Sequence, residues 1–262
     1  MKMKLHSLLV ATLSLGLAAS TFAQPGGPGG GMGGGSGGPN FGGSMSKLFG
    51  DNKTFSSTVE IQAKDGQAGD TTIPGKLMFD DGKSRFEMDM TKMKNSKMPP
   101  GAAEQMKAMG MDSMVVISRP DKKLSYMIYA GLNSYVEMPL KESDSAEAVN
   151  KLKVETTELA KETIDNHPTV KNKVVVTDEK GKKQEFIVWN ATDLKSFPVK
   201  LEMSERGTVV TMVFKDVKLA KPEAKLFDEP AGLKRYTNMM TMMQEEMMKK
   251  MGDGGGFAPP AR

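Results

Sequence analysis

Short runs of alternating apolar and polar residues recur along the middle of this chain, and they constrain its fold more than any other feature. In Arg85–Met90, the apolar side chains of Phe86, Met88 and Met90 alternate with two acidic residues. A period of two is typical of a strand with one buried face. Similar runs lie at 54–62, 73–79, 114–118, 124–129, 134–138, 170–177, 184–189, 199–203 and 208–217. Turn signals such as Asp80–Lys83 separate them. The sequence therefore predicts a mainly β (α+β) fold: one curved antiparallel sheet, or half-barrel.

Helical patterns are fewer and short. Residues 100–109 begin at a proline and end before Gly110, and residues 145–152 begin at a serine that can cap a helix. Residues 236–251 form the strongest pattern, in which Met239, Met240, Met243, Met247 and Met251 fall within one stripe. We expect a few short helices on the concave side of the sheet. We also expect this methionine-rich helix to fold back as a plug or to pair with another protomer.

The two ends of the chain differ in composition from the middle. Residues 1–23 combine Lys2 and Lys4 with an apolar stretch and end at Ala23, which predicts a cleaved signal peptide. Residues 24–44 are mostly Gly and Pro, and residues 252–262 are similar, so we expect a disordered tether and a disordered tail. Between them we expect a β domain over 45–236 and an amphipathic helix over 237–251.

The signal peptide predicts export, and we expect the mature protein in the periplasm. The sequence contains no cysteine, which excludes a lipidated N-terminus, disulfides and thiolate chemistry. Outside the signal peptide, no stretch approaches the ~18 apolar residues that a membrane helix needs, so we expect no transmembrane segment. The basic residues are interspersed with acidic ones and do not cluster with aromatic residues, so we expect no nucleic-acid partner.

Three groups of segments carry a resemblance to a known family. They are Gly82–Glu87 with Met114–Tyr126 and Asn133–Pro139; Glu162–Lys171 with Phe186–Trp189 and Phe197–Lys200; and Leu226–Leu233. In these segments the chain resembles the outer-membrane lipoprotein carrier and localisation proteins (LolA/LolB-like fold), and more closely still uncharacterised exported domains related to them. The resemblance implies a half-barrel whose concave face takes an apolar ligand. The chain departs from the localisation protein in having no lipidated cysteine.

Methionine is unusually frequent, with 24 residues in the chain, and many of them cluster at 88–98, 106–114 and 239–251. One interpretation is that the flexible, polarizable thioethers line an adaptable apolar groove. The candidate ligand-binding residues are then Met88, Met90, Met106, Met109, Met111, Tyr126 and Trp189. The alternative is a soft-metal protein that binds Cu(I) or Ag(I) through Met106, Met109, Met111 and Met114. A third interpretation is sacrificial oxidation of exposed methionine.

Catalytic patterns are missing from the sequence. His167 is the only histidine outside the expected signal peptide and precedes Pro168, which is typical of a turn. Carboxylate pairs such as Asp80/Asp81 have no histidine or metal-ligand spacing beside them. We therefore expect no enzyme activity and no cofactor. The favoured function is a periplasmic binding module for a lipid or acyl chain, with soft-metal binding as the alternative and an envelope interaction or structural module as the second alternative.

Overall fold

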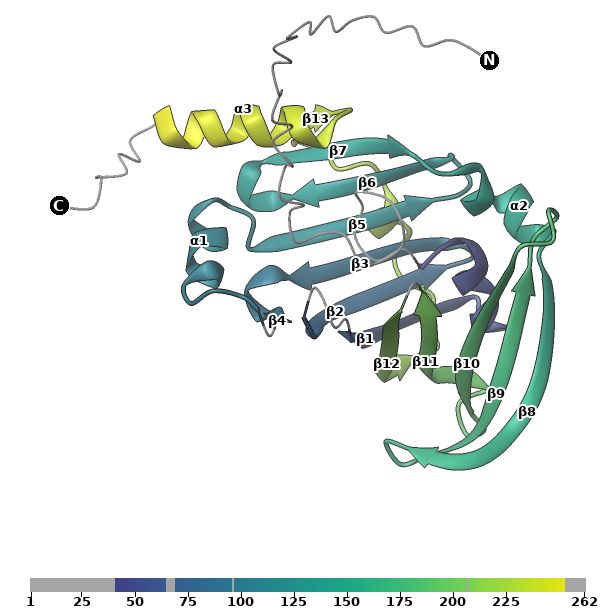
Figure 1. Ribbon diagram of the computed structural model, residues 1–262. Coiled ribbons are helices and arrows are strands. Elements are labelled where there is room, and N and C mark those ends of the chain that lie inside the picture. The colour runs from purple at the N-terminus through teal and green to yellow at the C-terminus, as the bar shows by residue number, and fades with distance from the viewer. Residues whose placement is uncertain (1–40, 65–68, 96, 206, 253–262) are drawn as a thin grey trace, which may run out of the picture.

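The computed structural model describes residues 41–64, 69–95, 97–205 and 207–252. The expected signal peptide, most of the expected tether and the expected tail from residue 253 onward lie outside these residues. The described residues form one curled 13-stranded sheet (Figure 1). Its order is β13-β7-β6-β5-β3-β2-β1-β12-β11-β10-β9-β8, with β4 paired to β2 off this path. The strands are β1 Thr54–Lys64, β2 Thr71–Asp80, β3 Lys83–Asp89, β4 Lys94–Asn95, β5 Ser113–Arg119, β6 Leu124–Tyr129, β7 Ser134–Pro139, β8 Lys153–Ile164, β9 His167–Thr177, β10 Lys183–Ala191, β11 Phe197–Glu205, β12 Thr208–Lys218 and β13 Lys234–Tyr236.

The predicted fold class is confirmed. All the strand pairs are antiparallel except β13 with β7, and the sheet curls without closing, as a half-barrel does. Every run that the alternation predicted as a strand lies in one of these strands, except that Met90, the last residue of the run 85–90, begins the short helix η2 (Met90–Lys92). The order also places β1 in the middle of the sheet, between β2 and β12.

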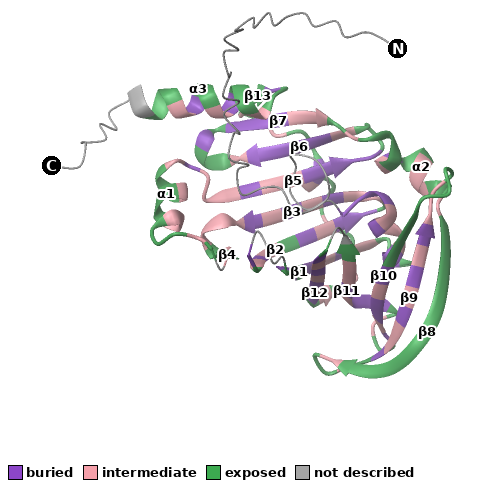
Figure 2. Ribbon diagram, viewed as in Figure 1, coloured by how far each residue is buried: buried purple, intermediate pink, exposed green. Residues whose placement is uncertain are grey.

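Strand β8 is the long element that the sequence analysis missed. Eleven of its 12 residues are exposed, and it forms an edge of the sheet (Figure 2). A strand exposed on both faces needs no apolar alternation, so residues 153–164 carry no period-two signal. A β-bulge at Leu159 and the charges of Glu155, Glu158 and Lys161 protect this edge from pairing with other chains.

The sheet has two buried faces. The inner face carries most of the core, including the cross-strand pairs Phe55–Phe79 and Leu77–Phe86. At Gly75, a Cβ atom would lie 2.4 Å from the Phe86 ring, so the glycine makes room for this large side chain. The outer face carries a second, smaller cluster around Ile117, Tyr126, Ile128, Tyr135 and Phe227. Neighbouring residues in a strand alternate between the two faces.

The short helix η1 (Gly43–Phe49) fills the inner face, and the sequence analysis did not assign it. Phe49 is 1% exposed, and its ring contacts those of Phe55, Phe79, Phe197 and Phe214 at centroid distances of 4.7–6.1 Å. The expected tether therefore ends too late. Its last residues, 41–44, belong to the domain, because the Phe41 side chain is 1% exposed and packs on Phe86. The glycines around Phe41 gave this segment the composition of a tether, although the Phe41 side chain is part of the core.

The segment that follows β12, residues 219–236, crosses the outer face, and we call it the strap. It includes η5 (Ala224–Phe227) and ends in β13, which pairs in parallel with β7 at the edge of the sheet. Phe227 is fully buried in the outer cluster. Two arginines from the sheet hold the strap, because Arg85 donates to the Leu226 carbonyl at 3.2 Å and Arg119 to the Phe227 carbonyl at 2.9 Å. The Phe-Asp-Glu-Pro segment is thus a structural anchor.

The remaining helices are short, apart from the last one. They are η2 Met90–Lys92, α1 Ala102–Ala108, η3 Ala130–Leu132, η4 Glu142–Asp144, α2 Ala146–Asn150 and α3 Met239–Gly252. Helix α1 has no buried residue and lies next to η2, whereas α3 runs along β7 and β13 (Figure 1). None of the helices in the described part of the chain is long and apolar enough to span a membrane.

Candidate functional site

Three methionine-rich parts of the sequence meet on the inner face. We define the methionine cluster as Met88, Met90, Met93, Met111, Met114, Met127, Met138, Met239, Met242 and Met243. These residues come from β3, η2, β5, β6, β7 and α3 and from the loops beside them. Met138 and Met239 pack against both the main core and the small cluster beneath α3, so the methionine cluster is continuous. It lines the end of the inner face nearest α3.

Strand register explains why these side chains meet. Met88 of β3 lies directly opposite Met114 of β5, and Met127 of β6 lies opposite Val136 of β7. Met138 lies two residues beyond Val136 and therefore faces the same side. Met88, Met114 and Met127 are buried, whereas Met90, Met93, Met111 and Met138 are half-buried. One part of the cluster is therefore buried in the core, and the other part is partly accessible apolar surface.

Helix α3 covers one end of this surface. Met242 is fully buried among Leu132, Val136 and Tyr236, and Met239 and Met243 are half-buried beside it. The stripe predicted from the sequence is wrong at Met240, which is 71% exposed, and it omitted Met242. Positions 242 and 246 are buried and positions 239, 243 and 247 are half-buried, which is an ordinary helical spacing and includes three residues of the predicted stripe. The stripe was predicted from methionine residues alone, so it did not include the charged but buried Glu246. The side chain of Met251 lies outside what the structure describes.

Polar contacts tie α3 to the sheet edge. The Tyr236 hydroxyl lies 2.6 Å from Glu246 Oε1 and 2.9 Å from Glu245 Oε2, so it can donate to either carboxylate. Lys234 Nζ lies 2.7 Å from Glu245 Oε2, and Lys249 Nζ lies 2.8 Å from Glu246 Oε1. Burial opposes ionisation of Glu246, but the hydrogen bonds from Lys249 and Tyr236 hold its pKa below the ordinary value. Glu246 is therefore a satisfied anion inside an apolar contact.

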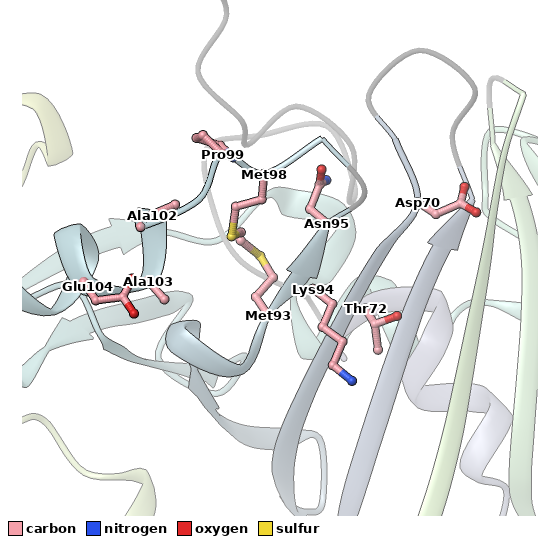
Figure 3. Close-up of a pocket in the computed structure, with 11 residues that line it drawn as sticks. Asp70, Thr72, Met93, Lys94, Asn95, Met98, Pro99, Ala102, Ala103 and Glu104 are labelled. Atoms are coloured by element: carbon pink, nitrogen blue, oxygen red, sulfur yellow. The ribbon is translucent and has the colours of Figure 1, made fainter.

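An open pocket of about 420 Å³ lies beside β4 and the start of α1 (Figure 3). Met93 and Met98 line it together with Thr72, Asn95 and Ala103, among others. In the close-up the two thioether side chains extend toward one another. The pocket borders the methionine cluster at Met93.

The candidate ligand-binding residues do not all lie together. Met88, Met90 and Met111 belong to the methionine cluster, whereas Met106 and Met109 lie on or just after α1 and are half-buried there. The metal candidates are likewise divided. Met106 and Met109 lie at α1, Met111 packs in the small cluster beneath α3, and Met114 lies in the main core.

Tyr126 and Trp189 lie outside the methionine cluster. Tyr126 is on the outer face, opposite Ile117. Trp189 lies between the ammonium groups of Lys171 and Lys200, at 5.0 and 4.2 Å, and donates from Nε1 to Glu162 at 3.0 Å. Sequence reasoning had treated both as groove residues because an aromatic residue in a strand does not reveal which face it occupies.

Two members of the methionine cluster, Met127 and Met138, lie outside the methionine-rich ranges of the sequence, and a third, Met242, lies within 239–251 but was left out of the predicted stripe. The alternation in 124–138 contained a signal for the first two, since it places Met127 and Met138 on one face once the strands pair. Met242 could not be found in this way, because its burial depends on how α3 docks.

Within the described ranges, no group of three or more His, Cys, Asp or Glu side chains could hold a metal ion. His167 Nδ1 lies 2.8 Å from Asp193 Oδ2 at the protein surface. That contact joins β9 to the loop after β10.

No family model matches the sequence, and no curated protein matches it. Solved structures with similar folds include a LolA superfamily protein from Nitrosomonas europaea, at 10% identity and a TM-score of 0.34, covering 70% of this chain and 93% of that one. The lipoprotein LppX from Mycobacterium tuberculosis has 10% identity and a TM-score of 0.38, covering 66% and 92%. LprF from Mycobacterium bovis has 12% identity and a TM-score of 0.36, covering 70% and 98%. TM-scores this low mark a loose likeness, from which nothing about ligand or partner follows.

The four tyrosines should titrate abnormally late. Burial raises the pKa of Tyr126 and Tyr129, and burial together with carboxylate hydrogen bonds raises the pKa of Tyr135 and Tyr236 to about 12. A raised tyrosine pKa stabilises the fold below pH 10, and that stability is lost as the pH rises toward 12. We expect little phenolate absorbance from the native protein at pH 10 and a free energy of unfolding that declines above it. The urea-unfolded chain is the control, and equal titration of both forms would contradict this expectation.

Proposed function

We propose that this protein is a non-enzymatic binding module of the periplasm that holds an apolar ligand, a lipid or acyl chain, against the methionine cluster. The proposal rests on one observation. The methionine cluster extends from the buried core to half-buried surface at the end of the inner face. Thioether side chains adapt to varied apolar shapes because they are unbranched and polarizable. A surface of this kind suits a flexible hydrocarbon chain better than a rigid, polar substrate.

The surroundings of the cluster support a binding role over a catalytic one. The buried members of the cluster lie in the apolar core, and the acidic residues of α3 beside it, Glu245 and Glu246, are paired with Lys234, Lys249 and Tyr236. General acid–base catalysis needs a titratable group within hydrogen-bond reach of the reacting atom. These carboxylates are committed to holding α3.

A soft-metal function is the second candidate, and one observation favours it. Met93 and Met98 share the open pocket and extend toward each other within it. Thioether sulfur is a suitable ligand for Cu(I) and Ag(I). Protein purified from a bacterial periplasm and examined by native mass spectrometry would separate the candidates, since a lipid and a copper ion add very different masses.

Probe binding tests the apolar site directly. We expect N-phenylnaphthylamine to fluoresce on binding and to be displaced by a long-chain fatty acid. The double variant Met111→Leu/Met138→Leu should keep probe affinity within a few-fold, because volume and apolarity are nearly conserved. Met111→Glu/Met138→Glu should lower it about tenfold or more, because each carboxylate would be desolvated on binding.

The matched control is Met240→Glu/Met248→Glu. These methionines lie on α3, which contributes Met239, Met242 and Met243 to the cluster, but they are 71% and 53% exposed. The control should bind the probe as wild type does. If it loses affinity as much as Met111→Glu/Met138→Glu, or if neither variant loses any, the ligand does not lie on the methionine cluster.

A further inference from the structure

The methionines of α3 fall into three classes of accessibility. Met242 is fully buried against Leu132 and Val136, and Met239 and Met243 are half-buried at the margins of this contact. Met240 and Met248 project away from the sheet. The helix therefore presents accessible thioethers that take no part in its docking and partly accessible thioethers on which its docking depends.

Apolar packing and the buried hydrogen bond from the Tyr236 hydroxyl to Glu246 seat α3 on the sheet. The polar contacts are its N-terminal cap, in which Asn238 Oδ1 accepts from the Met240 and Thr241 amides, and the pairs around Tyr236 and Lys234. Lys234 and Glu245 are 47% and 45% exposed, and pairs with such exposure contribute little to stability. The cap stabilises the helix itself and not its position on the sheet. A change in polarity at Met239 and Met243 would thus act on the apolar part of the docking contact.

Oxidation is the modification that changes methionine in this way. The sulfur lone pair attacks an oxygen of hydrogen peroxide, an S–O bond forms, the O–O bond breaks, and hydroxide leaves and takes up a proton as water. With hypochlorous acid the O–Cl bond breaks instead, and chloride and a proton leave. The thioether becomes a polar sulfoxide, which methionine sulfoxide reductases can reverse. At the α3 seat the new S=O group would face apolar side chains that cannot donate a hydrogen bond.

We propose that Met239 and Met243 form an oxidation-sensitive seat, at which sulfoxidation by hydrogen peroxide or hypochlorous acid releases α3 from the inner face. Release uncovers Leu132, Val136 and Met138. The mechanism depends only on how α3 is seated and is independent of the ligand proposed above. Oxidation of Met240 and Met248 leaves the helix docked, because neither packs on the sheet.

The test uses the full chain and hydrogen exchange of the α3 amides. After hydrogen peroxide treatment, peptide mapping should find sulfoxide at Met239 and Met243, and exchange across 242–249 should rise about tenfold or more. Amides of β9 to β12 should stay protected. Met239→Leu/Met243→Leu should keep α3 protected under the same treatment. Met240→Leu/Met248→Leu should respond as wild type does, and the two reductases should restore protection.

Several outcomes would overturn the proposal. Protection of α3 that persists when Met239 and Met243 are fully oxidised would do so, as would failure of both residues to oxidise when Met240 is fully converted. Equal loss of protection in the Met239→Leu/Met243→Leu variant would place the effect elsewhere. Simultaneous exposure of β9 to β12 would mean that oxidation unfolds the domain. Met239→Gln/Met243→Gln, which introduces polarity without oxidant, should undock α3 by itself, and a docked helix in this variant would also count against the proposal.

Discussion

Replacing Phe49 by alanine should destabilise the protein by about 3–5 kcal/mol, the usual range for a buried phenylalanine. The ring is 1% exposed and lies within 6.1 Å, centroid to centroid, of four other phenylalanine rings from β1, β2, β11 and β12. Its removal opens a cavity between strands from both halves of the sheet. Equilibrium unfolding in urea, followed by circular dichroism, measures the loss.

Leu159→Ala is the matched control. Leu159 is also a large apolar residue, but it is 51% exposed on the edge strand β8, so its truncation should change stability by less than about 0.5 kcal/mol. Phe49→Leu should lie between the two, because most of the volume is retained. A Phe49→Ala protein as stable as the Leu159→Ala protein would show that η1 does not pack into the inner face.

Truncating Phe227 should have an effect of similar size on the other face. Phe227→Ala should cost about 3–5 kcal/mol, because the side chain is fully buried against Ile117, Tyr126 and Tyr135. The strap would remain attached through Arg85 and Arg119, but it would have lost its apolar anchor. Thermal unfolding of the variant and the wild type at one protein concentration measures the difference.

Lys225→Ala controls for disturbance of the strap itself. Lys225 lies two residues away, is 78% exposed and pairs only with the exposed Glu223, so its loss should be close to neutral. If Phe227→Ala is also neutral, the strap does not close the outer face. A large loss in both variants would instead indicate that the strap is sensitive to any substitution.

The sheet could be predicted from the sequence because most of its strands bury one face. Runs such as that around Phe86 and Met88 alternate since the inner face is apolar and the outer face is largely polar there. β8 could not be predicted because neither of its faces is buried. η1 was missed because its apolar residues, Met45, Leu48 and Phe49, follow a glycine-rich stretch whose composition indicates an unfolded chain.

The candidate site was only partly predictable. Methionine frequency identified the residues of β3, β5 and α3, and strand register then brought Met88 and Met114 together. Tyr126 and Trp189 lie apart from the methionine cluster, which the sequence could not show because a strand of mixed aromatic and apolar residues has no polar face to fix its orientation. The residues that dock α3 differ from the predicted stripe, because the docked face includes the charged residue Glu246. Its partners, Tyr236 and Lys249, cannot be identified from hydropathy.

The central position of β1 has a consequence for the order in which the protein is assembled. Val59 pairs with Gly75 on one side and with Phe214 on the other, so one strand joins a neighbour close in sequence to one from the far end of the chain. Pairings that distant are slow to form, because a long loop must close before any contact compensates for it. We therefore expect β1 to β7 and β8 to β12 to collapse as separate meanders and to join late through β1 and β12. During synthesis, the N-terminal half must wait for β12 to emerge, which leaves the chain incompletely folded and open to chaperones throughout that interval.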